Sequence, residues 1–189
     1  MATPNMLGYS ITSSTQQPEV PFIVVGLRGN ATYIRPANLP AGSYWIVILS
    51  AKNPKQKVKE FVVPWDHHST VPPGLDAYMT NPDYIFAVVT YFISSSNVPQ
   101  GAFYDYLVKY GAGRELQRLE QVNLLTFCGS FSSVSYILTG QCGPRTPAPP
   151  PSYEAGSAYY STQAILLLSL ESLPNGQPPY GIINTYTWK

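Results

Sequence analysis

The stretch Tyr44-Trp45-Ile46-Val47-Ile48-Leu49 decides the fold of this 189-residue chain. Aromatic, β-branched and aliphatic residues follow one another without a break, which predicts a core β-strand within residues 43–51. Asn53-Pro54-Lys55-Gln56 then has the composition of a turn. A second apolar run, within residues 58–64, follows that turn, so the sequence predicts a β-hairpin.

Further strand patterns lie on both sides of this hairpin. They cover residues 7–12, 21–27, 31–35, 84–92, 132–139, 157–170 and 181–188. Between two of them, Phe103, Leu107 and Tyr110 recur at helical spacing, Gly111-Ala112-Gly113 ends that pattern, and residues 114–125 resume it.

This order predicts a β-rich α+β fold: two layers of antiparallel sheet, a sandwich, with a helical pair inserted between two strands and covering one sheet face. We expect one domain over residues 1–189, with a helical insertion at 97–126 and a Pro-rich loop at 140–156.

Charged residues are scarce. Asp, Glu, Lys and Arg make up 11% of the chain, against about 25% in an ordinary soluble domain. Tyrosine contributes 15 residues, and Tyr, Ser, Gly and Asn dominate many recognition surfaces. The composition therefore predicts a neutral, adhesive surface and favours non-catalytic recognition or self-assembly: a structural subunit, or a module that binds a glycan or a protein. The expected partners are a further copy of the chain or such a ligand.

The few charges are unevenly spread. They gather in the lysine-rich segment 55–59 and in the helical segment 105–120, and they leave the first fifty residues and the last forty-odd almost uncharged. We therefore expect binding at the terminal strands and at the Pro-Pro-x-Tyr motif, a pattern that WW domains bind but that also suits a rigid connector. The candidate binding residues are Tyr159, Tyr160, Tyr180, Tyr186, Trp188, Pro150, Pro151 and Tyr153.

An alternative function rests on Asp66-His67-His68, which holds both histidines of the chain. A metal-dependent enzyme would use these residues together with Asp76. Metal sites generally need three or four ligands, and neighbouring side chains of an extended segment point to opposite sides. The chain also has no Gly-x-Ser-x-Gly nucleophile motif. We therefore expect no enzyme, no catalytic residue, no metal ligand and no cofactor.

Other classes of partner have little support in the sequence. A net charge of +1 offers no electrostatic footprint for nucleic acid. The longest apolar stretch, residues 164–168 with Leu170 beyond, is far too short to span a bilayer.

Residues 1–5 do not have the pattern of a secretory signal, so we expect either a cytoplasmic protein or one released by a non-classical route. Cys128 and Cys142 could form a disulfide or remain two buried thiols.

Three segments carry a resemblance to a known family: Val88-Val89-Thr90, Leu107 to Ala112, and Ser135 to Gly140. They resemble a core strand, a helix that ends in Leu-x-x-x-Gly-Ser/Ala, and a strand with an aromatic residue that ends in Gly. These are features of the interleukin-like EMT inducer (PANDER-type) domain.

The resemblance covers residues 84–140. It implies two antiparallel sheets with flanking helices, and a non-catalytic role in secreted signalling or glycan binding. The chain lacks the family's Arg-Asp before the last strand and has only two cysteines, so neither a disulfide pattern nor a ligand site carries over.

Overall fold

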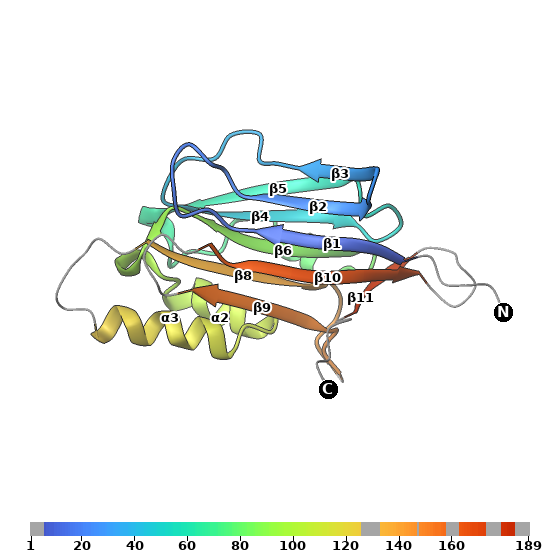
Figure 1. Cartoon of the computed structure of the whole chain (residues 1–189). Coiled ribbons are helices and arrows are strands. Elements are labelled where there is room, and N and C mark those ends of the chain that lie inside the picture. Colours follow the sequence, from blue (N-terminus) through green and yellow to red (C-terminus); the bar gives the residue numbers. More distant parts are fainter. Residues whose placement is uncertain (1–5, 126–132, 147, 158–162, 173–178, 184–189) are drawn as a thin grey trace, which may run out of the picture.

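The computed structural model describes residues 6–125, 133–146, 148–157, 163–172 and 179–183. These residues form two antiparallel sheets and a layer of helices (Figure 1). The predicted β-rich α+β sandwich is confirmed. No helix among the described residues is both long enough and apolar enough to cross a membrane.

Sheet A is built from the two ends of the chain. Its strand order is β11-β10-β1-β2-β3. The bounds are β1 Met6–Thr12, β2 Phe22–Leu27, β3 Asn30–Ile34, β10 Ile165–Ser172 and β11 Tyr180–Ile183. The segments with the fewest charges therefore come together in one sheet.

Sheet B contains the predicted hairpin of residues 43–64. Its order is β5-β4-β6-β8-β7, with β9 also paired to β8. The bounds are β4 Ser43–Ser50, β5 Lys57–Pro64, β6 Tyr84–Tyr91, β7 Ile93–Ser94, β8 Ser133–Gln141 and β9 Ser152–Ser157. Antiparallel pairing of β4 with β5 confirms the predicted hairpin.

The structure corrects two boundaries. The predicted loop at 140–156 is shorter, because β8 runs to Gln141 and β9 begins at Ser152. The strand expected over 157–170 is not continuous: β9 ends at Ser157 in sheet B, and β10 begins at Ile165 in sheet A. In the first place, pairing with β8 forms a strand from a Pro-rich segment whose local composition favours a loop. In the second place, β10 pairs with β1 and β11 and so belongs to the other sheet.

The helices lie on the face of sheet B that points away from sheet A. They are α1 Asp76–Met79, α2 Gly101–Lys109 and α3 Arg114–Leu125, and short 3₁₀ turns occupy Trp65–His67 and Ser95–Asn97. The helices α2 and α3 fall inside the predicted insertion 97–126. Helix α2 begins only at Gly101, because the second 3₁₀ turn ends at Asn97 and both Val98 and Gln100 have extended backbone.

Sheet B is covered on both faces, which explains the unbroken apolar run in β4. Trp45, Val47 and Leu49 belong to the core between the sheets. Tyr44, Ile46 and Ile48 belong to the core under the helices. Side chains alternate across a strand, so a strand between two apolar layers needs apolar residues at every position.

Hydrogen bonds connect β5 and the turn before it to the β3 side of sheet A. Lys55 Nζ donates to Asn30 Oδ1 at 3.0 Å, and Lys57 Nζ donates to the Arg35 carbonyl oxygen at 3.2 Å. Lys57 also pairs with Glu60 Oε2 at 2.8 Å, and Trp45 Nε1 donates to the same oxygen at 2.9 Å. Burial alone would raise the pKa of Glu60, but these two donors outweigh it and hold the pKa below its usual value.

Gly111 gives a first testable prediction, because it ends α2 with a φ of +100° and has no room for a side chain. A Cβ there would overlap Ser152 Oγ and lie 2.7 Å from Ser152 Cβ. We expect Gly111→Ala to lower the free energy of unfolding by about 3 kcal/mol in chemical denaturation.

The matched control is Gly29→Ala, since Gly29 also has a positive φ, +86°, and its Cβ would meet nothing within 4 Å. That change should cost only about 1 kcal/mol, the conformational penalty alone. Equal losses for the two variants would show that the contact with Ser152 is unimportant.

Candidate recognition surface

The outer face of sheet A carries apolar side chains that the described residues leave uncovered. Tyr33, Ile165 and Leu167 are 62%, 55% and 53% exposed. In Figure 1 no helix lies over β1, β2 or β10. We call this surface the open face and define it by residues that point outward in two rows across the strands. They are the exposed Tyr33, Ile165 and Leu167, the half-buried Ser10, Phe22 and Val24, and the buried Thr12.

Strand register places these residues side by side. Ser10 lies between Leu167 of β10 and Val24 of β2, and Val24 pairs with Tyr33 of β3. The second row runs from Ile165 through Thr12 to Phe22. None of the seven open-face residues carries a charge.

The inward residues of the same strands are buried against sheet B. Ile11, Ile23, Val25 and Leu168 alternate with the open-face residues and belong to the core between the sheets. The first four residues of β2 and of β10 are thus apolar on both faces, as in buried strands, yet only their inner face is covered within the described part of the chain. Further along its outer face, β10 carries Ser169 and Glu171.

A hollow of about 510 Å³ lies at one end of the open face. Thr12, Phe22 and Ile165 line it together with Pro18, Glu19, Val20, Arg35 and Gln163. Gln163 Nε2 donates to Glu19 Oε2 at 3.4 Å, and the ring of Phe22 lies 6.2 Å from that of Tyr33. The apolar face therefore ends in a rim that holds a carboxylate, a guanidinium and an amide.

Among the aromatic residues predicted to bind, Tyr153 and Tyr180 are the ones that the structure describes. Tyr159, Tyr160, Tyr186 and Trp188 lie outside the described residues. Tyr180, at the start of β11, packs against the core between the sheets, and its N–H donates to the Ala51 carbonyl at 2.8 Å.

The Pro-Pro-x-Tyr motif is tied into the fold. Tyr153 pairs with Thr139 in the β8–β9 ladder and is half-buried against the core between the sheets. The Gln141 N–H donates to the Pro151 carbonyl at 3.1 Å, and Arg145 Nη1 donates to the Pro150 carbonyl at 3.1 Å. This arrangement is that of a rigid connector, since a WW domain would have to detach Tyr153 from β8 to bind it.

The Asp66-His67-His68 segment forms an exposed 3₁₀ turn. Asp66 Oδ1 lies 2.9 Å from His67 Nδ1, and this hydrogen bond holds the pKa of Asp66 below its usual value. His68 Nδ1 instead contacts the Trp65 carbonyl, and Asp76 accepts a hydrogen bond from Tyr106 at 2.9 Å. Within the described ranges, no group of three His, Cys, Asp or Glu residues could hold a metal ion.

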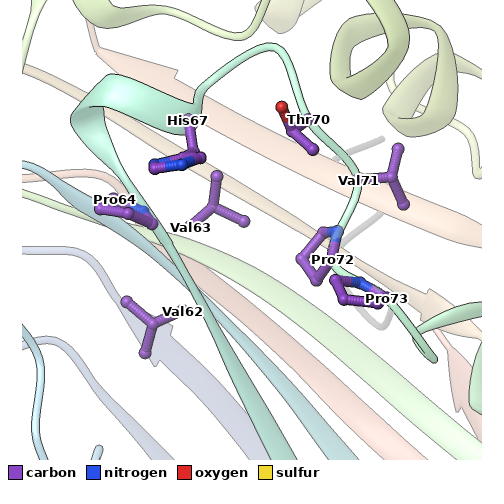
Figure 2. Close-up of a pocket in the computed structure, with 8 residues that line it drawn as sticks. All are labelled: Val62, Val63, Pro64, His67, Thr70, Val71, Pro72 and Pro73. Atoms are coloured by element: carbon purple, nitrogen blue, oxygen red, sulfur yellow. The ribbon is translucent and has the colours of Figure 1, made fainter.

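His67 also borders an apolar hollow of about 220 Å³ between β5 and the loop that follows the 3₁₀ turn (Figure 2). Apart from His67 and Thr70, its lining consists of Val and Pro side chains: Val62, Val63, Pro64, Val71, Pro72 and Pro73. The His67 imidazole thus lies beside apolar side chains, and the residues that line this hollow include neither a second histidine nor a carboxylate.

Cys142 is a buried free thiol, and burial raises its pKa to about 12. It is therefore protonated and unreactive at neutral pH. Cys128, its possible disulfide partner in the sequence analysis, lies outside the described residues.

The sequence analysis found the charge-poor strands but not the side chains that form the open face. The missed signal lies in Phe22-Ile23-Val24-Val25 and Ile165-Leu166-Leu167-Leu168, which are apolar at both alternating positions. Such runs predict cover on both faces, whereas the residues that the structure describes cover only one face of each run.

Comparisons with known proteins add no relative: no family model matches this chain, and no curated protein matches it.

Proposed function

We propose that this protein is a non-catalytic domain for recognition or self-assembly, and that the open face of sheet A is its contact surface. One observation carries the proposal: residues 22–25 of β2 and 165–168 of β10 are apolar at every position, as in strands buried on both sides, whereas Ile165 and Leu167 are more than half exposed. Exposed apolar patches rimmed by polar residues commonly mark interaction sites.

Burial of this face would stabilise a complex appreciably. Full burial of a Leu or Ile side chain contributes about 1.5–3 kcal/mol, so the half-exposed Ile165 and Leu167 would each add about 1 kcal/mol. Tyr33 adds a large amphipathic ring of the kind that is enriched at interfaces.

A binding module for a glycan or a protein is the second version of this function. The hollow at the end of the open face favours it, because Phe22 lies there beside Arg35, Glu19 and Gln163. An apolar surface with a few convergent polar groups is the usual composition of a ligand site. The resemblance of residues 84–140 to the interleukin-like EMT inducer domain would imply the same non-catalytic class, and it too remains a proposal.

The test replaces two open-face residues with lysine in one variant, Ile165→Lys with Leu167→Lys. The matched control, Val58→Lys with Val108→Lys, adds the same charge at exposed apolar positions outside sheet A. Sedimentation velocity from about 1 µM to about 1 mM measures self-association, and glycan and peptide arrays measure ligand binding.

Wild type and control should associate with themselves or bind an array ligand, and the open-face variant should bind at least about tenfold more weakly, the equivalent of about 1.4 kcal/mol. A wild-type protein that does neither, or an open-face variant that binds as well as the control, would contradict the proposal.

A further inference from the structure

We infer that the occupant of the open face is a second copy of this chain, packed face to face about a two-fold axis that runs parallel to the strands. This inference rests on the proposed function and names its partner. It follows from how charges are distributed around the open face, together with the size of that face.

Acidic and basic residues lie along opposite sides of the open face. On the β10 side, Glu171 belongs to β10 itself, and Glu19 accepts a hydrogen bond from Gln163 next to the start of that strand. On the β3 side, Arg28 lies in the turn between β2 and β3, and Arg35 directly follows β3.

The register shows which charges share an end of the sheet. Glu171 pairs with Met6, and that end also holds the β2–β3 turn with Arg28, since Gly8 pairs with Gly26. Glu19 and Arg35 both line the hollow at the other end. Each end of the open face thus carries an acid on the β10 side and a base on the β3 side.

A two-fold axis parallel to the strands uses this pattern. It keeps each end of the sheet opposite the same end of the second copy, and it places the β10 side over the β3 side. Glu171 then faces Arg28 of the second copy, and Glu19 faces Arg35 of the second copy. Every contact occurs twice, because a two-fold interface is self-complementary.

The other in-plane two-fold axis, perpendicular to the strands, is disfavoured by the same charges. It would place the β10 side over the β10 side with the ends exchanged, so that Glu171 faces Glu19 and Arg28 faces Arg35. Like charges brought together across an interface oppose association, and complementary charges fix its orientation. The charges therefore select one of the two arrangements.

The size of the face suits a reversible dimer. The whole outer face of sheet A, of which the open face is a part, has five strands about 4.8 Å apart, each about six residues long at about 3.3 Å per residue, and presents roughly 500 Å². Two copies would bury about 1,000 Å², near the lower limit for a specific interface. Two twisted sheets commonly pack face to face with their strand directions at about −30° to one another, and two copies of this face can pack in the same way.

The test is a charge exchange followed by sedimentation equilibrium at low salt. Glu171→Arg and Arg28→Glu each place like charges opposite one another twice in the dimer, so each should raise the dimer dissociation constant at least about fivefold. The double variant recreates both pairs with the charges exchanged, and it should return the constant to within about threefold of wild type. Asp105→Arg, on the exposed side of α2, is the control and should change nothing.

Thermal unfolding of each variant checks that the chain remains folded, and restoration in the double variant supports the proposed dimer. A wild-type protein that stays monomeric at about 1 mM, single reversals without effect, or a double variant no better than the single ones would overturn it. A monomer whose array binding is lost in the Ile165→Lys, Leu167→Lys variant would overturn the dimer and leave the proposed function standing.

Discussion

Above about pH 10 the protein is expected to lose stability steeply, by at least about 4 kcal/mol per pH unit, because at least three buried tyrosines stay protonated in the fold. Burial raises the pKa of Tyr9, Tyr44 and Tyr136 well above the ordinary value of 10.0. Each is hydrogen-bonded: Tyr9 to Thr139 Oγ1, Tyr44 to the Asn97 carbonyl, and Tyr136 to Glu154.

The sign follows from which state releases protons. Below pH 10 both states hold the phenol protons, so these groups do not change the stability with pH. Above pH 10 the unfolded chain loses them and the folded chain does not, and each group then lowers the free energy of unfolding by about 1.4 kcal/mol per pH unit. Cys142 adds a similar loss from about pH 9, since its pKa in the fold is about 12.

Denaturant unfolding between about pH 7 and pH 11 measures this dependence. Tyr9→Phe should reduce the alkaline slope by about 1.4 kcal/mol per pH unit, because it removes one of the buried phenols that stay protonated in the fold. Tyr33→Phe, which alters an exposed ring of the open face, is the matched control and should leave the slope unchanged. A stability that stays flat to pH 11 in the wild-type protein would refute the assignment of these tyrosines.

Trp45→Ala is expected to lower the free energy of unfolding by about 3–5 kcal/mol, the usual loss when a large aromatic side chain is removed from a core. Trp45 is fully buried between the two sheets. Its indole Nε1–H also donates to Glu60 at 2.9 Å, so the truncation removes a donor from a carboxylate that helps to close the sandwich.

Trp65→Ala is the control for this prediction, because Trp65 is 57% exposed and belongs to the 3₁₀ turn after β5. It should cost no more than about 1 kcal/mol. Midpoints of chemical denaturation compare the two variants. A Trp45→Ala protein as stable as the Trp65→Ala protein would show that the core between the sheets is not what holds them together.

Much of the fold could be predicted from local patterns. The unbroken apolar run from Tyr44 to Leu49 indicated a core strand, and the structure covers it on both sides. The turn at Asn53–Gln56 identified the β4–β5 hairpin, and the spacing of Phe103, Leu107 and Tyr110 identified α2. These features depend on residues that are close in sequence, so their patterns are visible without the rest of the chain.

Features that depend on distant pairing could not be predicted in the same way. β9 begins at Ser152, inside a Pro-rich stretch, because its backbone pairs with β8. The faces of the β5 lysines also depend on pairing: a register shift between Ile48 and Leu49 places Lys57 opposite Leu49 and Lys59 opposite Ile48, so the two lysines lie on different faces.

The sequence indicated the strands that form sheet A but not which of their side chains are exposed. Charge depletion indicated the terminal strands, and these strands form sheet A. Aromatic content indicated Tyr180 and Tyr153, which pack against the core, whereas the exposed side chains of β10 are the aliphatic Ile165 and Leu167. The alternation that separates inward from outward residues depends on the exact strand start, and a shift of one residue exchanges the two faces.

The central claim, that the open face is the contact surface, is tested most directly by covalent labelling of side chains in the free and the associated protein. The account predicts that Tyr33, Ile165 and Leu167 lose label on association with a second copy or an array ligand, while exposed Val108 and Trp65 keep theirs. A complex in which the three open-face residues label as they do in the free protein would contradict it.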